Sequence, residues 1–419
     1  MKQNAKTTSW AQMTTWLLSA NILRNVGLIV VLVVLARLTS AETVGRYALA
    51  LAITTPIFVL AQMGLKGVYL TMHHDYRFRS YALVQLVMVA AAVIVSVGVA
   101  LVFNRDLIVT VTLVAVIKVA DSLSEFFSAP LQKYDAARRI FWAYLTSAVL
   151  GSAVTGVALA LTRDLDVALA GLAATSLFVA IFLMGFPARR LVRGREGDAH
   201  ALLAPAQDRR RILRAGLPMG VAGAILALVS SMPQYFLARD HGEGVVGYFV
   251  VLLYVFAIVD IFSGTLTQAW IPKARLALEN TDGDHFRFLR STLVTTGWWS
   301  LVLMPLAIIG LVIVSLLLPI VFGPEYVLSF AVALPLFVGI VVLPSTHFGG
   351  TAVAVQNFYV HGITLSIGSA LVSLIACSVL IPGFSAAGAL WAISLAYAAR
   401  GVFAFVILYL RARSLASAR

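Results

Sequence analysis

Six ionisable side chains lie within otherwise apolar stretches of this chain: Arg24, Lys118, Asp121, Glu125, Asp260 and Arg400. On insertion scales, one charge at the centre of a bilayer costs about 3 kcal/mol. Six of them would cost more than the ~5–15 kcal/mol by which a typical domain is stable. We therefore expect these side chains to face one another, a water-filled cavity or a ligand, rather than lipid.

The densest polar pattern is a stripe in which Lys118, Asp121, Ser122, Glu125 and Gln132 recur at steps of three and four residues. On a helix this spacing places them on one face. Lys118 can pair with Asp121 within the helix, which leaves Glu125 to pair elsewhere or to take up a proton. A purely structural role between helices stays open for Lys118 and Asp121.

Arg24 shares a helical face with Asn21 and Asn25. It lies too deep in its apolar segment to reach the interface easily, and amides cannot neutralise its charge. We therefore expect Arg24 to face a cavity. Arg400 lies nearer the end of its segment, so a position at the interface and a functional position are both open.

Asp260 has no basic residue close to it in sequence, which favours a functional role for its carboxylate. His347 and His361 are more typical of hydrogen-bonded residues between helices. Because polar faces occur in both halves of the chain, we expect an aqueous cavity between two lobes.

The segments that carry these charges are membrane-spanning helices. Hydrophobic residues make up 61% of the chain and charged residues 12%, against ~45–50% and ~25% in soluble domains. A spanning helix needs about 20 apolar residues. The fold class is therefore an all-α polytopic membrane protein. The twelve predicted spans are Trp16–Leu38, Val44–Leu65, Tyr81–Phe103, Leu107–Leu131, Phe141–Leu161, Val167–Phe186, Leu213–Leu237, Val245–Trp270, Thr292–Leu318, Tyr326–Phe348, Phe358–Leu380 and Ala386–Leu410.

The stretch Pro187–Arg214 carries eight arginines and divides the chain into two hydrophobic halves. So many charges cannot enter a bilayer, so we expect a cytoplasmic loop there. The predicted domains are an N-terminal six-helix lobe (1–187), a basic linker (188–212) and a C-terminal six-helix lobe (213–419).

The distribution of Lys and Arg predicts the orientation of the chain. With both termini in the cytoplasm, 23 of these residues lie inside and five lie outside. The net charge of +13 then reflects topology and contact with anionic membrane lipids. It calls for no nucleic-acid partner.

A short element occurs once in each half. Leu35-Ala36-Arg37 precedes Val44-Gly45, and Leu237-Ala238-Arg239 precedes Val246-Gly247, so Arg and Gly are eight residues apart in both copies. Six spans separate the copies, so both halves enter the membrane in the same sense. This favours a parallel repeat, as in transporters whose two lobes rock about a central site. Chance similarity of two short turns is the alternative.

The sequence offers no motif for catalysis or cofactor binding in the structural context that the motif requires. Gly242-Glu243-Gly244-Val245-Val246-Gly247 matches a dinucleotide fingerprint but joins two spans, so a tight turn is expected. The sequence has no Walker loop, and its lone Cys377 excludes a disulfide framework. No predicted outer loop is long enough for a catalytic platform. We expect no enzyme, no cofactor and no metal.

Four degenerate motifs, in this order and within a twelve-span frame, resemble the polysaccharide and oligosaccharide flippases of the multidrug/oligosaccharidyl-lipid/polysaccharide (MOP) exporter superfamily. They are Leu35-Ala36-Arg37-Leu38 with Val44-Gly45-Arg46-Tyr47, Leu131-Gln132-Lys133-Tyr134 with Arg138-Arg139, Val321-Phe322-Gly323-Pro324-Glu325-Tyr326, and Ile381-Pro382-Gly383-Phe384 with Gly388-Ala389.

The resemblance implies an O-antigen-like flippase in the cell inner membrane. It would move an undecaprenyl-diphosphate-linked oligosaccharide outward for O-antigen, capsule or exopolysaccharide synthesis, with a polysaccharide polymerase complex as a further partner. A diphosphate is anionic and suits Arg or Lys. The candidate substrate-binding residues are Arg24, Asn21, Asn25, Lys118 and Arg400. The candidate residues for a coupling ion, H⁺ or Na⁺, are Asp121, Glu125 and Asp260.

Two other classes stay open. A cation-coupled exporter of drugs or other organic molecules, from the same superfamily, would use acidic residues such as Asp121 and Glu125, although Arg24 argues against it. A non-transporting scaffold would not need charges inside its spans. Lipid II flippases resemble the chain as well but look like fourteen-span proteins. Major-facilitator transporters share the six-plus-six plan, but the loop after the second span matches theirs weakly.

Overall fold

The computed structural model describes residues 10–71, 77–196, 206–279, 285–356 and 359–416, and these residues form helices and no strand. They divide into two compact units, Met1–Ala224 and Ile225–Arg419, and the boundary falls inside one long helix. The predicted division at 187 and 213 stays a prediction, and part of its linker, 197–205, lies outside the described residues.

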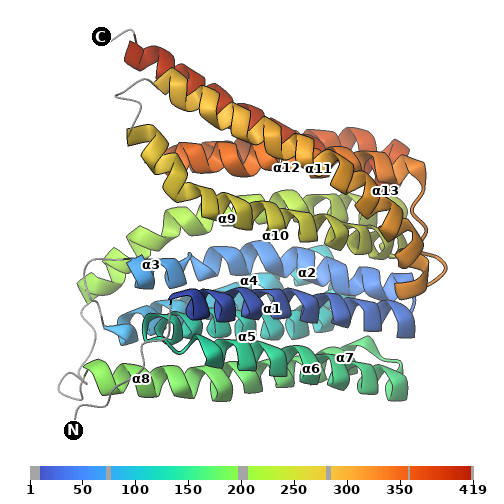
Figure 1. Cartoon of the computed structure of the whole chain (residues 1–419). Helices are drawn as coiled ribbons and strands as arrows, with labels where there is room; N and C mark the ends of the chain where they lie inside the picture. The colour runs from blue at the N-terminus through green and yellow to red at the C-terminus, as the bar shows by residue number, and fades with distance from the viewer. Residues whose placement is uncertain (1–9, 72–76, 197–205, 280–284, 357–358, 417–419) are drawn as a thin grey trace. The chain divides into compact units, whose positions relative to one another are not determined.

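Unit 1 contains the helices of the first half of the chain (Figure 1). They are α1 (Trp10–Leu38), α2 (Ala41–Gln62), α3 (Leu65–Thr71), α4 (Phe78–Phe103), the 3₁₀ turn η1 (Arg105–Leu107), α5 (Ile108–Lys133), α6 (Ala137–Thr162), α7 (Leu165–Phe178), the π-helical stretch η2 (Val179–Gly185), α8 (Phe186–Glu196) and the first part of α9 (Ala206–His241). Helix α1 packs along α6, and α5 contacts α2, α4 and α7.

Unit 2 contains the rest of α9, α10 (Glu243–Glu279), α11 (His285–Val321), α12 (Phe330–Val355) and α13 (Tyr359–Ala416). Helix α12 packs against α10, α11 and α13.

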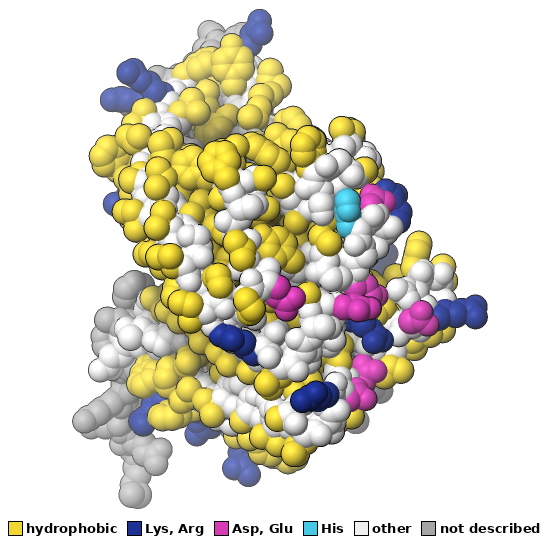
Figure 2. Space-filling model, turned by 90° about the vertical axis from the view of Figure 1, so that its right-hand side faces the viewer, with side chains coloured by type: hydrophobic (Ala, Val, Ile, Leu, Met, Phe, Trp, Pro, Cys, Tyr) yellow, Lys and Arg dark blue, Asp and Glu magenta, His cyan; other side chains and the backbone are white. Residues whose placement is uncertain are grey.

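Large hydrophobic side chains on the outside of both units identify the solvent as lipid. Phe103, Leu161 and Phe330 each expose about 80% of their surface, and hydrophobic side chains cover much of the face in Figure 2. Soluble proteins do not expose so many large apolar residues together. Eleven helical elements in the described residues are long and apolar enough to cross a membrane. The predicted fold class, an all-α polytopic membrane protein, is confirmed.

The difference between eleven elements and the predicted twelve spans lies in α13. Its 58 residues comprise two helices that meet at Ser385, where the backbone leaves helical geometry with φ 50° and ψ −129°. Arg400 Nη1 donates to Ser366 Oγ at 3.2 Å, so the two halves run side by side. The predicted spans Phe358–Leu380 and Ala386–Leu410 correspond to these halves, although Phe358 lies outside the described residues. The count of twelve membrane crossings stays a prediction.

The described parts of the basic central segment are helical, whereas we expected a loop. Helix α8 continues to Glu196, and α9 begins at Ala206. A connection between spans need not be irregular, since Arg is a good helix former and helices can continue past the bilayer. Arg189, Arg190 and Arg193 are accordingly borne on a helix that extends α7 and η2.

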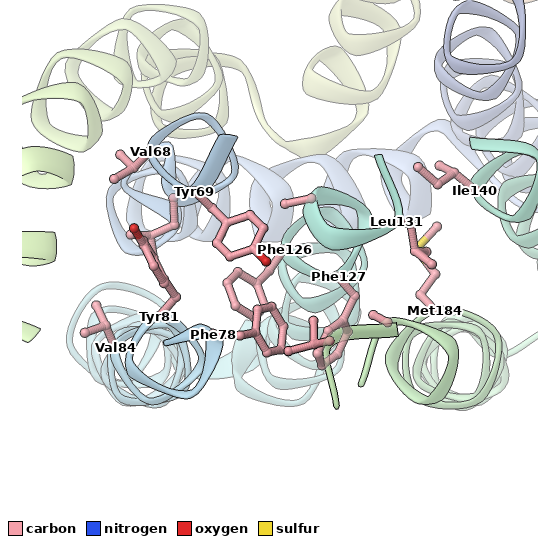
Figure 3. Close-up of a cluster of buried hydrophobic side chains, with 14 of the residues drawn as sticks. Val68, Tyr69, Phe78, Tyr81, Val84, Phe126, Phe127, Leu131, Ile140 and Met184 are labelled. Atoms are coloured by element: carbon pink, nitrogen blue, oxygen red, sulfur yellow. The ribbon is translucent and has the colours of Figure 1, made fainter. Parts of the chain in front are cut away.

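The core of unit 1 is aromatic at the end where α3, α4 and α5 meet (Figure 3). Phe78 and Phe126 stack with ring centroids 5.0 Å apart, and Tyr69 meets Tyr81 edge to face at 5.3 Å. Phe127 completes the cluster. Such pairs add about 0.5–1.5 kcal/mol each beyond area burial. This core supports the face of α5 that carries Ser122 and Glu125.

Candidate functional site

An ion pair between α1 and α5 forms the centre of the candidate site. Arg24 Nη1 lies 3.4 Å from Glu125 Oε2, and the two side chains keep 36% and 33% of their surface exposed. The pair corrects the expectation that Arg24 has no neighbour able to neutralise it. The neutralising charge comes from Glu125, for which the sequence indicated no partner and which lies 101 positions away from Arg24.

The local sequence of α1 explains how Arg24 comes close to α6. At Gly27, one turn further on, an added Cβ would lie 2.9 Å from the Cβ of Ala148. The missing side chain therefore allows α1 and α6 to approach closely, as small residues do between membrane helices. Arg24 consequently interacts with Tyr144 of α6 as well as with Glu125 and Asp121.

These side chains border a narrow cavity of about 60 Å³ inside unit 1, lined among others by Arg24, Asp121, Ser124 and Tyr144. A water molecule needs ~10–15 Å³ of such space. The cavity can therefore hold a few waters but no sugar. The stripe on α5 places Asp121 and Glu125 near Arg24, and Arg24 and Asp121, but not Glu125, line this partly polar cavity.

The remaining candidates of unit 1 are placed less centrally. Asn21 is exposed, and Asn25 Nδ2 donates to the Asn21 carbonyl oxygen at 2.8 Å. Lys118 is half-buried and feels the charges of Asp121 and Arg24, yet none of the described acidic groups forms an ion pair with it within 4 Å. Their assignment to substrate stays a prediction.

A second, larger cavity lies on the other side of Glu125. It has a volume of about 230 Å³ and is lined by Gln62, Lys66, Gln85, Ser122, Glu125 and Phe126, with apolar residues between them. We call it the Gln85 pocket. No pattern in the sequence indicates this pocket, because Lys66 belongs to the charges expected on the cytoplasmic side and Gln85 is a lone polar residue in the predicted span Tyr81–Phe103.

The Gln85 pocket exists because the expected span Val44–Leu65 is interrupted. Helix α2 ends at Gln62, and both Met63 (φ 47°) and Gly64 (φ 58°) are left-handed. Glycine adopts this geometry without strain, and Met63 shares it at the end of the helix. Because of this break, Lys66 at the start of α3 lies near Glu125. The signal in the sequence was the Gly64 that follows Met63.

Unit 2 contains the other two predicted charges, Asp260 and Arg400, each with its own hydrogen-bond partner. His347 Nε2 lies 2.9 Å from Asp260 Oδ1, which joins α12 to α10 and gives Asp260 a partner that its sequence neighbourhood lacks. Arg400 donates to Ser366, while its buried Nε has no partner in the described part of the chain. His347 thus takes the role of a hydrogen-bonded residue between helices. An aqueous cavity between the lobes stays a prediction.

Comparison with known proteins gives consistent matches. The family model described as "Polysaccharide biosynthesis protein" matches residues 10–274. The capsular polysaccharide biosynthesis protein CapF of Staphylococcus aureus is 25% identical over 371 residues, which cover 88% of this chain and 92% of CapF.

Solved structures share the fold at low sequence identity. The MATE transporter VcmN of Vibrio cholerae has a TM-score of 0.62 at 13% identity, covering 96% of both chains. The lipid II flippase MurJ, in an inward closed conformation, has a TM-score of 0.60 at 11% identity, covering 96% of this chain and 87% of MurJ. The chain therefore has the fold of MOP-superfamily transporters.

Proposed function

Because the chain belongs to the polysaccharide biosynthesis protein family and has the fold of MOP transporters, we propose that it is a flippase for a lipid-linked oligosaccharide. It carries an undecaprenyl-diphosphate-linked sugar from the inner to the outer leaflet of the cytoplasmic membrane, and it makes or breaks no covalent bond. Both termini face the cytoplasm, as the distribution of Lys and Arg predicts.

The observation that carries this proposal is the Arg24–Glu125 pair, whose arginine lines a narrow, partly polar cavity. A fixed cation inside a span suits an anionic head group, and a carboxylate paired with it keeps the empty site neutral. When the diphosphate arrives, it competes with Glu125 for the guanidinium, which can bind phosphate oxygens bidentately. The two lobes then alternate access to the two sides.

The test replaces Arg24 by Ala and by Lys in a strain that lacks the chromosomal gene, and measures surface polysaccharide. The alanine variant should abolish export, because no cation remains to receive the diphosphate. The lysine variant should retain part of the activity, since it keeps the charge but loses the bidentate geometry. Full export by the alanine variant would remove Arg24 from the mechanism.

A cation-coupled exporter of organic molecules is the second candidate. The similarity to VcmN in fold and the position of Asp121 on the wall of the narrow cavity favour it. Dye efflux measured in a strain unable to make lipid-linked sugars separates the two candidates. Efflux that persists there and disappears in the Asp121→Asn variant would support the exporter and contradict the flippase.

A further inference from the structure

The Gln85 pocket contains a hydrogen-bond donor that the fold leaves unused. Gln85 is only 1% exposed, lines the pocket, and its Nε2 has no partner among the described residues. Leaving a buried donor unsatisfied costs about 1–3 kcal/mol, and such a group in a folded protein calls for an explanation. A ligand with an oxygen acceptor in the pocket would satisfy it.

The other polar groups on the wall supply both hydrogen-bond donors and hydrogen-bond acceptors. Gln62 Nε2 donates to Ser122 Oγ at 3.0 Å, which leaves the serine hydroxyl hydrogen free to donate to a ligand. Glu125 is the one carboxylate on the wall and accepts only. Phe126 and the apolar residues supply the rest of the lining. A few polar groups on a mostly apolar wall are typical of sites for small organic ligands.

Charge limits the kind of ligand. Glu125 is paired with Arg24, whereas none of the acidic groups in the described part of the chain lies within 4 Å of Lys66. Glu125 interacts with both Arg24 and Lys66, so these three side chains together carry one more positive than negative charge. A single negative charge on the ligand would balance it. A phosphate or diphosphate carries more charge than Lys66 can balance and would be repelled by Glu125.

Size gives a further limit. A volume of about 230 Å³ is well above what one water needs and below the ~300–1,000 Å³ of sites for drug-sized ligands. One sugar ring fits that interval. Its hydroxyl groups can donate to Glu125 and accept from Gln85.

We propose that the Gln85 pocket binds one acidic sugar residue of the transported head group, with the carboxylate of the sugar on Lys66, one of its oxygens accepting from Gln85 Nε2, and a hydroxyl group donating to Glu125. The inference rests on the proposed flippase function. It adds a specificity pocket on the other side of Glu125 from the narrow cavity beside Arg24.

The experiment measures binding of three probes to the purified full-length protein in detergent: glucuronate, glucose and inorganic pyrophosphate. Tryptophan fluorescence or the shift in melting temperature reports binding. Glucuronate should bind at least about tenfold more tightly than glucose, because its carboxylate forms a charge-assisted bond to Lys66. The Lys66→Gln variant should lose that tenfold preference and leave glucose binding unchanged. Lys273→Gln, at an exposed position of α10, is the matched control.

The Gln85→Leu variant provides an independent readout. It should weaken the binding of both sugars by about three- to tenfold. It should also raise the melting temperature of the ligand-free protein, because an unsatisfied buried donor is replaced by an apolar side chain of similar size. A purely structural glutamine would show the opposite change in stability. Gln268→Leu, at an exposed position, is the matched control.

Three results would overturn the proposal. They are no binding of glucuronate, equal binding to wild type and Lys66→Gln, and pyrophosphate binding that Lys66→Gln abolishes. Export of surface polysaccharide by the same wild-type protein is measured in parallel. Export without glucuronate binding would contradict the proposed sugar pocket but not the proposed flippase function. Glucuronate binding without export would reject the flippase.

Discussion

Arg24 and Glu125 should act as a unit. A double-mutant cycle tests this by neutralising Arg24, Glu125 or both. Arg24→Gln and Glu125→Gln each remove one charge and keep a side chain of similar reach. Each single variant removes the ion-pair partner of the charge that remains, whereas the double variant removes both charges. The double variant should therefore be less impaired in stability than the sum of the two single variants.

The magnitude follows from the geometry. At a separation of 3.4 Å, Coulomb's law with an effective dielectric constant near 20 gives an attraction of about 5 kcal/mol. The exposed third of each side chain allows screening, so the net coupling lies between the ~0.2–1 kcal/mol of exposed pairs and the ~3–5 kcal/mol lost when a buried pair is broken. We expect about 1–3 kcal/mol, or about 5- to 150-fold in the folded-to-unfolded ratio.

The assay is denaturant unfolding of the four proteins in one detergent, with surface polysaccharide measured in cells. A control cycle pairs Glu125→Gln with Arg105→Gln, an exposed residue outside the cavity, and should show no coupling. Export should fail in Arg24→Gln and in the double variant, and it should fall in Glu125→Gln, where Arg24 no longer has a partner that can displace the head group. Strict additivity in the Arg24–Glu125 cycle, or unchanged export in all three variants, would refute the reasoning.

Three further predictions concern stability. Gly216→Ala should cost about 1–3 kcal/mol in unfolding experiments, because its Cβ would lie 2.8 Å from the Met63 carbonyl oxygen. In Gly98→Ala, by contrast, the added Cβ would have no atom within 4 Å, so the free energy of unfolding should rise by about 0.5–1 kcal/mol. Equal effects of the two substitutions would contradict the close contact between Gly216 of α9 and Met63. Ser385→Gly should raise the melting temperature, since φ 50° at the α13 reversal favours glycine; a fall would show that the serine side chain has another role. His347→Leu should cost about 1–2 kcal/mol by leaving Asp260 without its partner, and that cost should shrink when Asp260→Asn is added.

Much of the fold could be predicted because the bilayer imposes it. Apolar stretches in lipid must be helical to satisfy their own backbone, so the predicted spans correspond to the helices that the structure contains. The hairpin at Ser385 was predicted as a break between Leu380 and Ala386. The interruption of α2 was not, because Met63 is a good helix former and one following glycine is a weak signal. The helical form of the described parts of the basic segment was not predicted, because a run of charges indicates a position outside lipid and says nothing about backbone conformation.

The amino-acid sequence by itself determined that this is a membrane protein and that the charges within its spans need partners. Both conclusions follow from the free energy of transferring side chains into lipid. Which partners they have was decided only by the tertiary structure. Arg24 lies beside Tyr144 because Gly27 lets α1 approach α6, and Lys66 lies beside Gln85 because α2 breaks at Met63. Such contacts depend on the rotation and close approach of helices far apart in sequence, and helical periodicity determines only which face a residue occupies.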